Sequence, residues 1–274
     1  MKNIKYLCLI YFIVFSFSKS IGQEVGVDTV NVFSTSMNKM ISNLVFLPAS
    51  YEAQKEKQPV LYLLHGAGGN FAIWYKRFPN LQKYANNHNI IIVCPDSGTS
   101  WYFDSPLDKK MKYETYVSSE LVNYIDTNYS TIKNRKGRAV LGLSMGGHGA
   151  FYLSFKHQDV YGAAGSMSGG LDIRPFPKNW DLSKRLGAYA TNKEFWEVNS
   201  VINMVYLIGG SDLKLIFDCG TSDFFYDANK RMHQKLLERN IPHTYIERPG
   251  GHNPDYWREA LKYQILFMTE FFKN

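Results

Sequence analysis

The feature that most restricts how this chain can fold is a buried-type apolar segment, Arg138–Leu143, which runs through Gly-Leu-Ser-Met-Gly into a helical stretch. Gly142 and Gly146 flank Ser144. Glycine is preferred at a sharp strand-to-helix turn, because backbones approach there too closely for a Cβ atom. Such a turn exposes the serine hydroxyl. The pattern therefore predicts a nucleophilic Ser144 within an α/β fold.

Apolar runs of strand length alternate with helical stretches along the rest of the chain. From the third run onward this alternation predicts βαβ units and a mostly parallel central sheet of about eight strands flanked by helices. The first two runs, joined by the short segment 36–39, predict an antiparallel edge. Active sites of such sheets lie at the carboxyl ends of the strands. The eight runs are 29–34, 41–47, 60–64, 90–94, 138–143, 162–167, 213–219 and 243–248.

The beginning of the chain has the pattern of a secretory signal peptide, residues 1–22. Lys2 and Lys5 precede an apolar run, 6–17, and small residues follow at Ser20 and Gly22. An uncleaved anchor is the alternative, but the run is shorter than the roughly 18 to 20 residues of a spanning helix. We therefore expect a secreted or periplasmic protein with one catalytic domain, 23–274.

Loss of residues 1–22 removes three lysines and no acid, so the formal net charge falls from +7 to +4. The remaining basic residues are scattered along the sequence. A nucleic-acid or anionic-membrane surface is therefore not indicated, and a small or polysaccharide-linked molecule is the expected partner. The sequence shows no metal-ligand cluster and no cofactor fingerprint, so we expect neither a metal nor a cofactor.

A second chemical motif follows the run Val60–Leu64, where the chain continues as His-Gly-Ala-Gly-Gly. Backbone amides in such a loop can stabilise the oxyanion of an acyl-transfer intermediate without reorganising. We assign this role to the amides of Ala67 and Met145. A phosphate-binding loop is disfavoured because no Lys-Ser or Lys-Thr pair follows. His65 is expected to be structural.

The general base and its acid should follow the serine in the order acid, then histidine. His252 comes late, after a strand-like run and a Gly-Gly pair, and is the candidate base. Asp223 is the favoured acid because it lies in the loop beyond an apolar run. Asp218, inside that run, is the alternative. His148 is expected to face away from Ser144, since it rides the helix just after the turn.

Five segments together resemble the esterase D group of α/β hydrolases. This group includes feruloyl esterase modules, tributyrin esterases, S-formylglutathione hydrolase and mycolyltransferases. The resemblance extends over about 45–272 and implies the α/β-hydrolase fold, a triad of Ser144, Asp223 and His252, and oxyanion amides at Ala67 and Met145. The segments that carry it are 63–69, 100–104, 142–147, 218–225 and 249–257.

The strand order implied by this resemblance separates two cysteines. Cys94 would end the fourth strand and Cys219 the seventh, with three strands between them. At ~4.8 Å per strand they would lie roughly 19 Å apart, whereas a disulfide needs Cα atoms within about 7 Å. Both are therefore expected to be free thiols.

The sequence restricts the identity of the substrate less than it restricts the type of reaction. Segment 171–203, which carries Trp180 and Trp196, is long enough to form a small cap over the site. Trp101, Tyr102 and Trp257 are candidate substrate-binding residues. Together with export, these features favour a serine carboxylesterase acting on feruloyl or acetyl groups of plant polysaccharide. A general short-chain esterase and an acyltransferase of the mycolyltransferase type are the alternatives.

Overall fold

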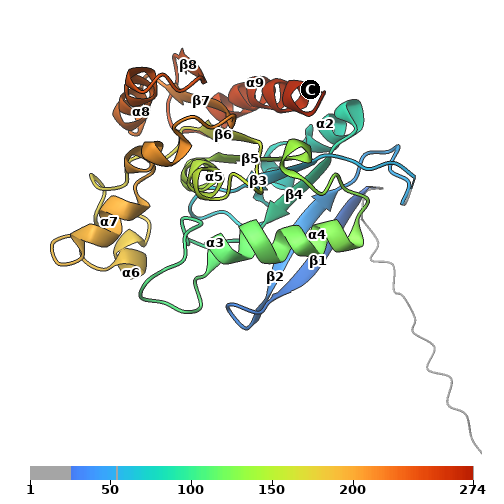
Figure 1. Ribbon diagram of the computed structural model, residues 1–274, viewed down its shortest axis with the longest axis horizontal. Helices are drawn as coiled ribbons and strands as arrows, with labels where there is room; N and C mark the ends of the chain where they lie inside the picture. Colours follow the sequence, from blue (N-terminus) through green and yellow to red (C-terminus); the bar gives the residue numbers. More distant parts are fainter. Residues whose placement is uncertain (1–25, 54, 274) are drawn as a thin grey trace, which may run out of the picture.

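The computed structural model describes residues 26–53 and 55–273. The signal peptide expected at 1–22 lies outside the described residues. Within them, the segments form one central β-sheet with helices on both of its faces (Figure 1). This is the α/β arrangement that the alternation of strand-like and helical segments predicts.

All eight predicted runs form strands, with ends that shift by no more than two residues. The order across the sheet is β1-β2-β4-β3-β5-β6-β7-β8. β1 and β2 pair antiparallel at one edge, β2 also pairs antiparallel with β4, and the remaining neighbours are parallel. The strands are β1 (Val27–Ser34), β2 (Lys39–Phe46), β3 (Val60–Leu64), β4 (Ile91–Pro95), β5 (Arg138–Leu143), β6 (Ala163–Met167), β7 (Lys214–Gly220) and β8 (Thr244–Arg248).

Two hydrophobic layers enclose the sheet. Leu61 and Leu63 of β3 pack in the layer with α1, α2 and α9, whereas Tyr62 and Leu64 pack in the layer with α4, α5 and α8. A strand covered on both faces is apolar throughout, which explains the continuous run in β3. The helices are α1 (Ile73–Arg77), α2 (Leu81–His88), α3 (Tyr113–Thr115), α4 (Leu121–Asn128), α5 (Met145–Lys156), α6 (Leu182–Leu186), α7 (Lys193–Asn199), α8 (Tyr226–Glu238) and α9 (Pro254–Lys273).

The predicted insertion 171–203 contains α6 and α7 and lies to one side of α5, between β6 and β7 in the chain (Figure 1). Trp196 is buried within it and donates a hydrogen bond from Nε1 to the Gly187 carbonyl, 3.0 Å away. Trp180 is only partly buried and reaches the cavity described below. The insertion therefore contributes a wall to that cavity.

Cys94 and Cys219 are both buried and free, as the strand order predicts. β3, β5 and β6 separate their strands in the sheet.

The longest helix, α9, ends the described chain, and no helix in 26–53 or 55–273 combines the length and apolar character that a membrane span requires.

Candidate active site

Ser144 occupies a strained turn between β5 and α5. Its backbone has φ 56° and ψ −118°, a conformation that few residues other than glycine adopt. A Cβ at Gly142 would lie 2.2 Å from the Gly146 carbonyl oxygen, and one at Gly146 would lie 2.2 Å from that of Leu64. The two flanking glycines are therefore required by close backbone contacts. A hydrogen bond from the Ser144 amide to the Met167 carbonyl, 2.8 Å, fixes the turn to β6.

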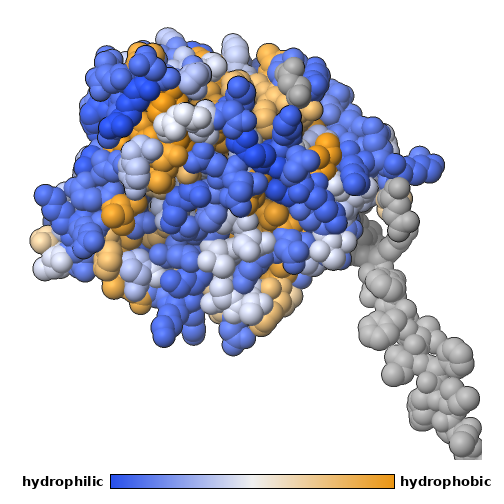
Figure 2. All heavy atoms as spheres, in the orientation of Figure 1, coloured by the Kyte–Doolittle hydropathy of each residue, from blue (hydrophilic) through white to orange (hydrophobic). Residues whose placement is uncertain are grey.

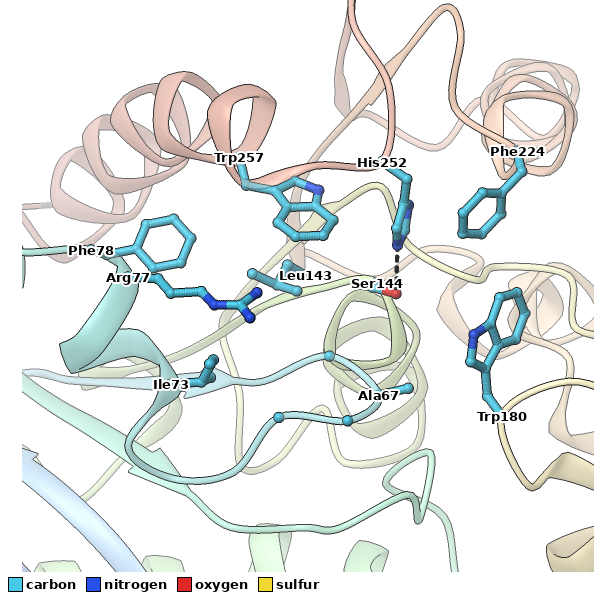
Figure 3. A pocket seen from close by; sticks show the side chains of 13 residues that line it. Ala67, Ile73, Arg77, Phe78, Leu143, Ser144, Trp180, Phe224, His252 and Trp257 are labelled. Carbon is cyan, nitrogen blue, oxygen red and sulfur yellow. Dashed lines mark hydrogen bonds between the residues drawn. The ribbon is translucent and has the colours of Figure 1, made fainter.

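The structure brings Ser144, His252 and Asp223 together from three separate strand ends. His252 Nε2 lies 2.9 Å from Ser144 Oγ (Figure 3). On the other side of the ring, Nδ1 lies 2.9 Å and 3.1 Å from the two carboxylate oxygens of Asp223. With a neutral ring, Nδ1 donates to Asp223 and Nε2 accepts the proton of the serine hydroxyl. A proton can pass from Ser144 to His252 along this path.

Asp223 is held rigidly where it meets the ring. Its side chain is fully buried, and its Oδ1 accepts a hydrogen bond from the Phe225 amide, 2.8 Å. The His252 ring lies between aromatic side chains, with its centroid 4.2 Å from that of Phe224 and 4.9 Å from that of Trp257. Electrostatic interactions are stronger in such a partly dry environment than in water. The imidazolium that forms in the reaction would therefore interact strongly with Asp223.

The alternative acid, Asp218, points elsewhere. It lies inside β7, and its Oδ2 accepts a hydrogen bond from the Gln264 side chain of α9, 2.7 Å. Arg248 of β8 is 3.9 Å from Oδ1. Burial raises the pKa of Asp218 to about 6. No hydrogen bond in the described part of the chain joins this carboxyl to His252.

The loop after β3 orients the Ala67 amide through a shared peptide bond. The Gly66 carbonyl accepts hydrogen bonds from the Gly69 amide, 3.0 Å, and from His65 Nδ1, 2.8 Å. The His65 tautomer follows from its other contact, because the Ser97 amide donates to Nε2 at 3.0 Å. C=O and N–H point in opposite directions across one trans peptide. Anchoring the Gly66 carbonyl therefore fixes the Ala67 N–H in the opposite direction.

The second predicted oxyanion amide belongs to Met145, the first residue of α5. Amides in the first turn of a helix have no acceptor within the helix, and the helix dipole favours negative charge at this end. Ala67 and Ser144 line the same cavity. The two candidate amides therefore come from the loop after β3 and from the first turn of α5.

A cavity of about 290 Å³ surrounds Ser144 (Figure 3). It has two arms. The acyl arm, as we name it, is bounded by Ile73, Arg77, Phe78, Leu143 and Trp257, and the open arm by Trp180 and Phe224. Trp257 is thus in the cavity, as the sequence suggested. The complete lining is Gly66, Ala67, Gly68, Gly69, Ile73, Arg77, Phe78, Leu143, Ser144, Trp180, Phe224, His252 and Trp257.

Trp101 and Tyr102, the other two candidate substrate-binding residues, are not in the cavity, and this expectation is corrected. Both backbones have positive φ, 59° and 62°, and both rings are buried. Trp101 Nε1 donates to the Trp180 carbonyl, 3.1 Å, and Tyr102 OH to the His65 carbonyl, 3.0 Å. They support the cavity wall and the loop after β3 from behind.

His148 also faces away from Ser144, as expected. It is fully buried, and its ring nitrogens lie 3.0 Å and 2.8 Å from the carbonyl oxygens of Trp101 and Asn199. Burial lowers the pKa of His148 to about 4.

Within 26–53 and 55–273, no group of three or more His, Cys, Asp or Glu side chains could hold a metal ion.

Sequence reasoning missed five lining residues. Phe224 and Leu143 could have been found, because each is adjacent in sequence to a predicted triad residue. Ile73, Arg77 and Phe78 carried no such signal, since α1 joins the site only through the packing of the tertiary structure.

Comparisons with known proteins show the family of this chain. A family model, Esterase, described as "Putative esterase", matches residues 34–268. The chain is 25% identical to an acetyl esterase of Caldicellulosiruptor saccharolyticus over 88% of this chain and 97% of that protein. It is 30% identical to a solved ferulic acid esterase, with a TM-score of 0.76, over 89% of this chain and 98% of that one.

A third similarity is to an S-formylglutathione hydrolase of Staphylococcus aureus. It has a TM-score of 0.78 and 21% identity, over 89% of this chain and 98% of that one. At this level of identity the similarity shows the fold alone. The α/β-hydrolase fold and the family predicted from the sequence motifs are confirmed.

Proposed function

Because the chain belongs to the Esterase family and is a carboxylic ester hydrolase, we propose that Ser144 is its nucleophile, His252 its general base and Asp223 the acid that orients His252. The observation that carries this proposal is the continuous set of contacts from Asp223 through His252 to Ser144 at a strained strand-to-helix turn. That arrangement is what an activated serine nucleophile requires.

The proposed reaction has two halves. Ser144 Oγ attacks the ester carbonyl while His252 Nε2 takes the hydroxyl proton, and the amides of Ala67 and Met145 stabilise the oxyanion. His252 then donates that proton to the leaving alcohol, which leaves an acyl-enzyme. Water, deprotonated by His252, attacks the acyl carbonyl. The bond from this carbon to Ser144 Oγ then breaks as His252 returns the proton to Oγ, and the acid is released. Throughout, Asp223 stabilises the imidazolium that forms.

The substrate that we propose is an acyl ester on plant polysaccharide, feruloyl or acetyl. Two relatives support it by their names, a ferulic acid esterase and an acetyl esterase. The open arm of the cavity supports it physically, because the Phe224 ring is half exposed and leaves space for a large alcohol. We also propose that the protein is secreted or periplasmic, on the pattern of residues 1–22, so that it meets its ester outside the cytoplasm.

The test is hydrolysis of p-nitrophenyl acetate, p-nitrophenyl butyrate and methyl ferulate by the wild type and by Ser144→Ala. The alanine variant should lose about three or more orders of magnitude in kcat on every ester that the wild type cleaves. Ser183→Ala is the matched control, because Ser183 is exposed on α6. More than a tenth of wild-type activity in Ser144→Ala would overturn the assignment. Faster product formation with added sugar acceptors would instead identify an acyltransferase.

A further inference from the structure

A cationic side chain, Arg77, lies in the same cavity as Ser144. It is the last residue of α1, and its guanidinium extends into the acyl arm toward Ser144, beside Leu143 and below Phe78 (Figure 3). Arg77 as a residue is solvent-exposed, but its charged end is directed into the cavity. The charge is permanent, because a guanidinium is not deprotonated in proteins.

No acid in 26–53 or 55–273 neutralises that charge. The cavity lining contains neither aspartate nor glutamate, and His252 is its other ionisable group. Among the described residues, no carboxylate lies within ion-pair distance of the Arg77 guanidinium. The neighbouring Arg258 differs, because it forms an ion pair with Asp255 and donates from Nε to the Arg77 carbonyl, 3.3 Å. A need for a protein partner therefore does not explain the orientation of Arg77.

A helix-terminal role does not explain it either. Basic residues in the last turn of a helix interact favourably with its dipole, but Lys76 already occupies that turn of α1. Lys76 does not line the cavity. The distinguishing property of Arg77 is its position in the acyl arm.

The two arms differ in how far they are closed. In the acyl arm, Phe78, Leu143 and Trp257 are less than a tenth exposed, while Ile73 is partly buried and Arg77 is exposed. In the open arm, Trp180 is partly buried and Phe224 is half exposed. An ester on a polymer needs an open path for its alcohol and only a bounded space for its acyl group. The acyl arm, with its buried apolar walls, therefore suits the acyl group better than the open arm. The exposed Arg77 bounds it opposite Ser144, with its guanidinium directed into the cavity (Figure 3).

We propose that Arg77 makes this esterase selective for acyl groups that carry a negatively charged oxygen at their far end, such as a carboxylate. The inference rests on the proposed serine-esterase site and changes its acyl specificity, because it favours a charged acyl group over the neutral feruloyl and acetyl groups named above. A guanidinium presents several N–H donors to a carboxylate, and such charge-assisted hydrogen bonds are about twice as strong as neutral ones. The apolar walls beside it would contact the body of the acyl group.

The experiment uses rigid methyl cinnamates, whose para group cannot reach back to attack the ester. The three substrates carry a para carboxylate, a para methyl or a para aminomethyl group, and p-nitrophenyl acetate is assayed in parallel. The wild type should favour the carboxylate over the methyl compound by about tenfold or more in kcat/KM. High salt should reduce this ratio, because the charge lies near solvent. Arg77→Met should remove the preference, and Arg77→Glu should transfer it to the aminomethyl compound.

Lys76→Met is the matched control. It removes one positive charge from the same helix turn outside the cavity, so the ratio of carboxylate to methyl substrate should stay within about twofold of the wild type. Equal ratios in wild type and Arg77→Met, with p-nitrophenyl acetate still cleaved, would overturn the inference alone. Loss of the ratio in Lys76→Met as well would also overturn it, by showing a general field effect. Failure of the wild type to cleave any ester would instead overturn the proposed function.

Discussion

The interior of β7 and the loop that follows it each hold a buried acid, and the two acids differ in what they face. Asp218, within the strand, faces Gln264 of α9. Asp223, beyond the carboxyl end of the strand, faces His252. Both side chains are fully shielded from solvent. Burial alone therefore does not bring an acid to the candidate site. What distinguishes Asp223 is its position beyond the carboxyl end of the strand, where sites of such sheets lie.

The largest expected effect is the difference in kcat between a variant that loses the Asp223 carboxylate and one that loses the Asp218 carboxyl. Asp223→Asn should lower kcat by about 10⁴-fold, because an amide cannot hold the reactive His252 tautomer or stabilise the imidazolium. Asp218→Asn should keep at least about a tenth of wild-type kcat at pH 7, because its carboxyl does not touch the ring. Steady-state kinetics on one ester measures both. A larger loss in Asp218→Asn would reverse the comparison.

A smaller effect is expected at His65. We infer that it orients the proposed oxyanion amide of Ala67 from behind, as the proposed acid Asp223 orients His252. His65→Asn can still donate to the Gly66 carbonyl from a nitrogen near the position of Nδ1. His65→Gln can reach the Ser97 amide instead but leaves the Gly66 carbonyl without that donor. We therefore expect kcat to fall about tenfold or more in His65→Gln and less in His65→Asn, with KM little changed in both.

Equal losses of kcat in the two variants would contradict a positioning role for His65. Thermal unfolding of both proteins is the control, because a general loss of stability would affect kcat through the folded fraction. The two variants should therefore be compared at a temperature where each is fully folded.

The third expectation concerns stability rather than catalysis. Burial raises the folded-state pKa of Asp218 from 3.8 to about 6. Protonated Asp218 therefore contributes its full share to the free energy of unfolding below pH 3.8, and this contribution is lost as the pH rises through about 6. Its total is at most roughly 3 kcal/mol. Asp218→Asn should therefore gain stability relative to the wild type between pH 4 and pH 7.

Urea unfolding at the two pH values measures this gain. The comparison between variants is needed because other groups act in the opposite direction. Burial acts to raise the pKa of Glu114, but hydrogen bonds from His157 and Lys156 outweigh it and lower that pKa from 4.5 to about 2. The contribution of Glu114 is therefore complete above about pH 4.5 and is lost as the pH falls from there through about 2. If the difference in free energy of unfolding between Asp218→Asn and the wild type were the same at pH 4 and pH 7, Asp218 would not titrate in this range.

The smallest expected effect is at Cys219, which lies on β7 next to Asp218. Burial raises the pKa of its thiol, and that of Cys94, far above the ordinary range. The thiolate is the reactive form, so Ellman's reagent at pH 8 should leave both cysteines unmodified and the activity unchanged. Both should react after denaturation. Rapid labelling of the native protein would show that the end of β7 opens, and would weaken the contrast with the Asp223 loop.

Local signals in the sequence determined the strands, the turn at Ser144 and the order of the motifs. The eight strands were predictable because each is a short run of strand character, and from the third onward helical stretches separate them. Their observed ends differ from the predicted ones by up to two residues. The glycines around Ser144 could be recognised from the sequence because a sharp strand-to-helix turn favours glycine on both sides of the serine. His252 and Asp223 were readable because they follow strand-like runs late in the chain, although Asp218 remained an alternative.

Only the tertiary structure decided which side chains line the cavity around Ser144. Trp101 and Tyr102 follow β4 as the candidate residues should, yet a left-handed backbone turns both rings inward beneath α5. Arg77 has no motif, and the packing of α1 beside the loop after β3 brings it into the cavity. Periodicity and spacing report how a segment is buried. The direction of a loop side chain, however, depends on a few backbone dihedrals and on contacts with segments far away in the sequence.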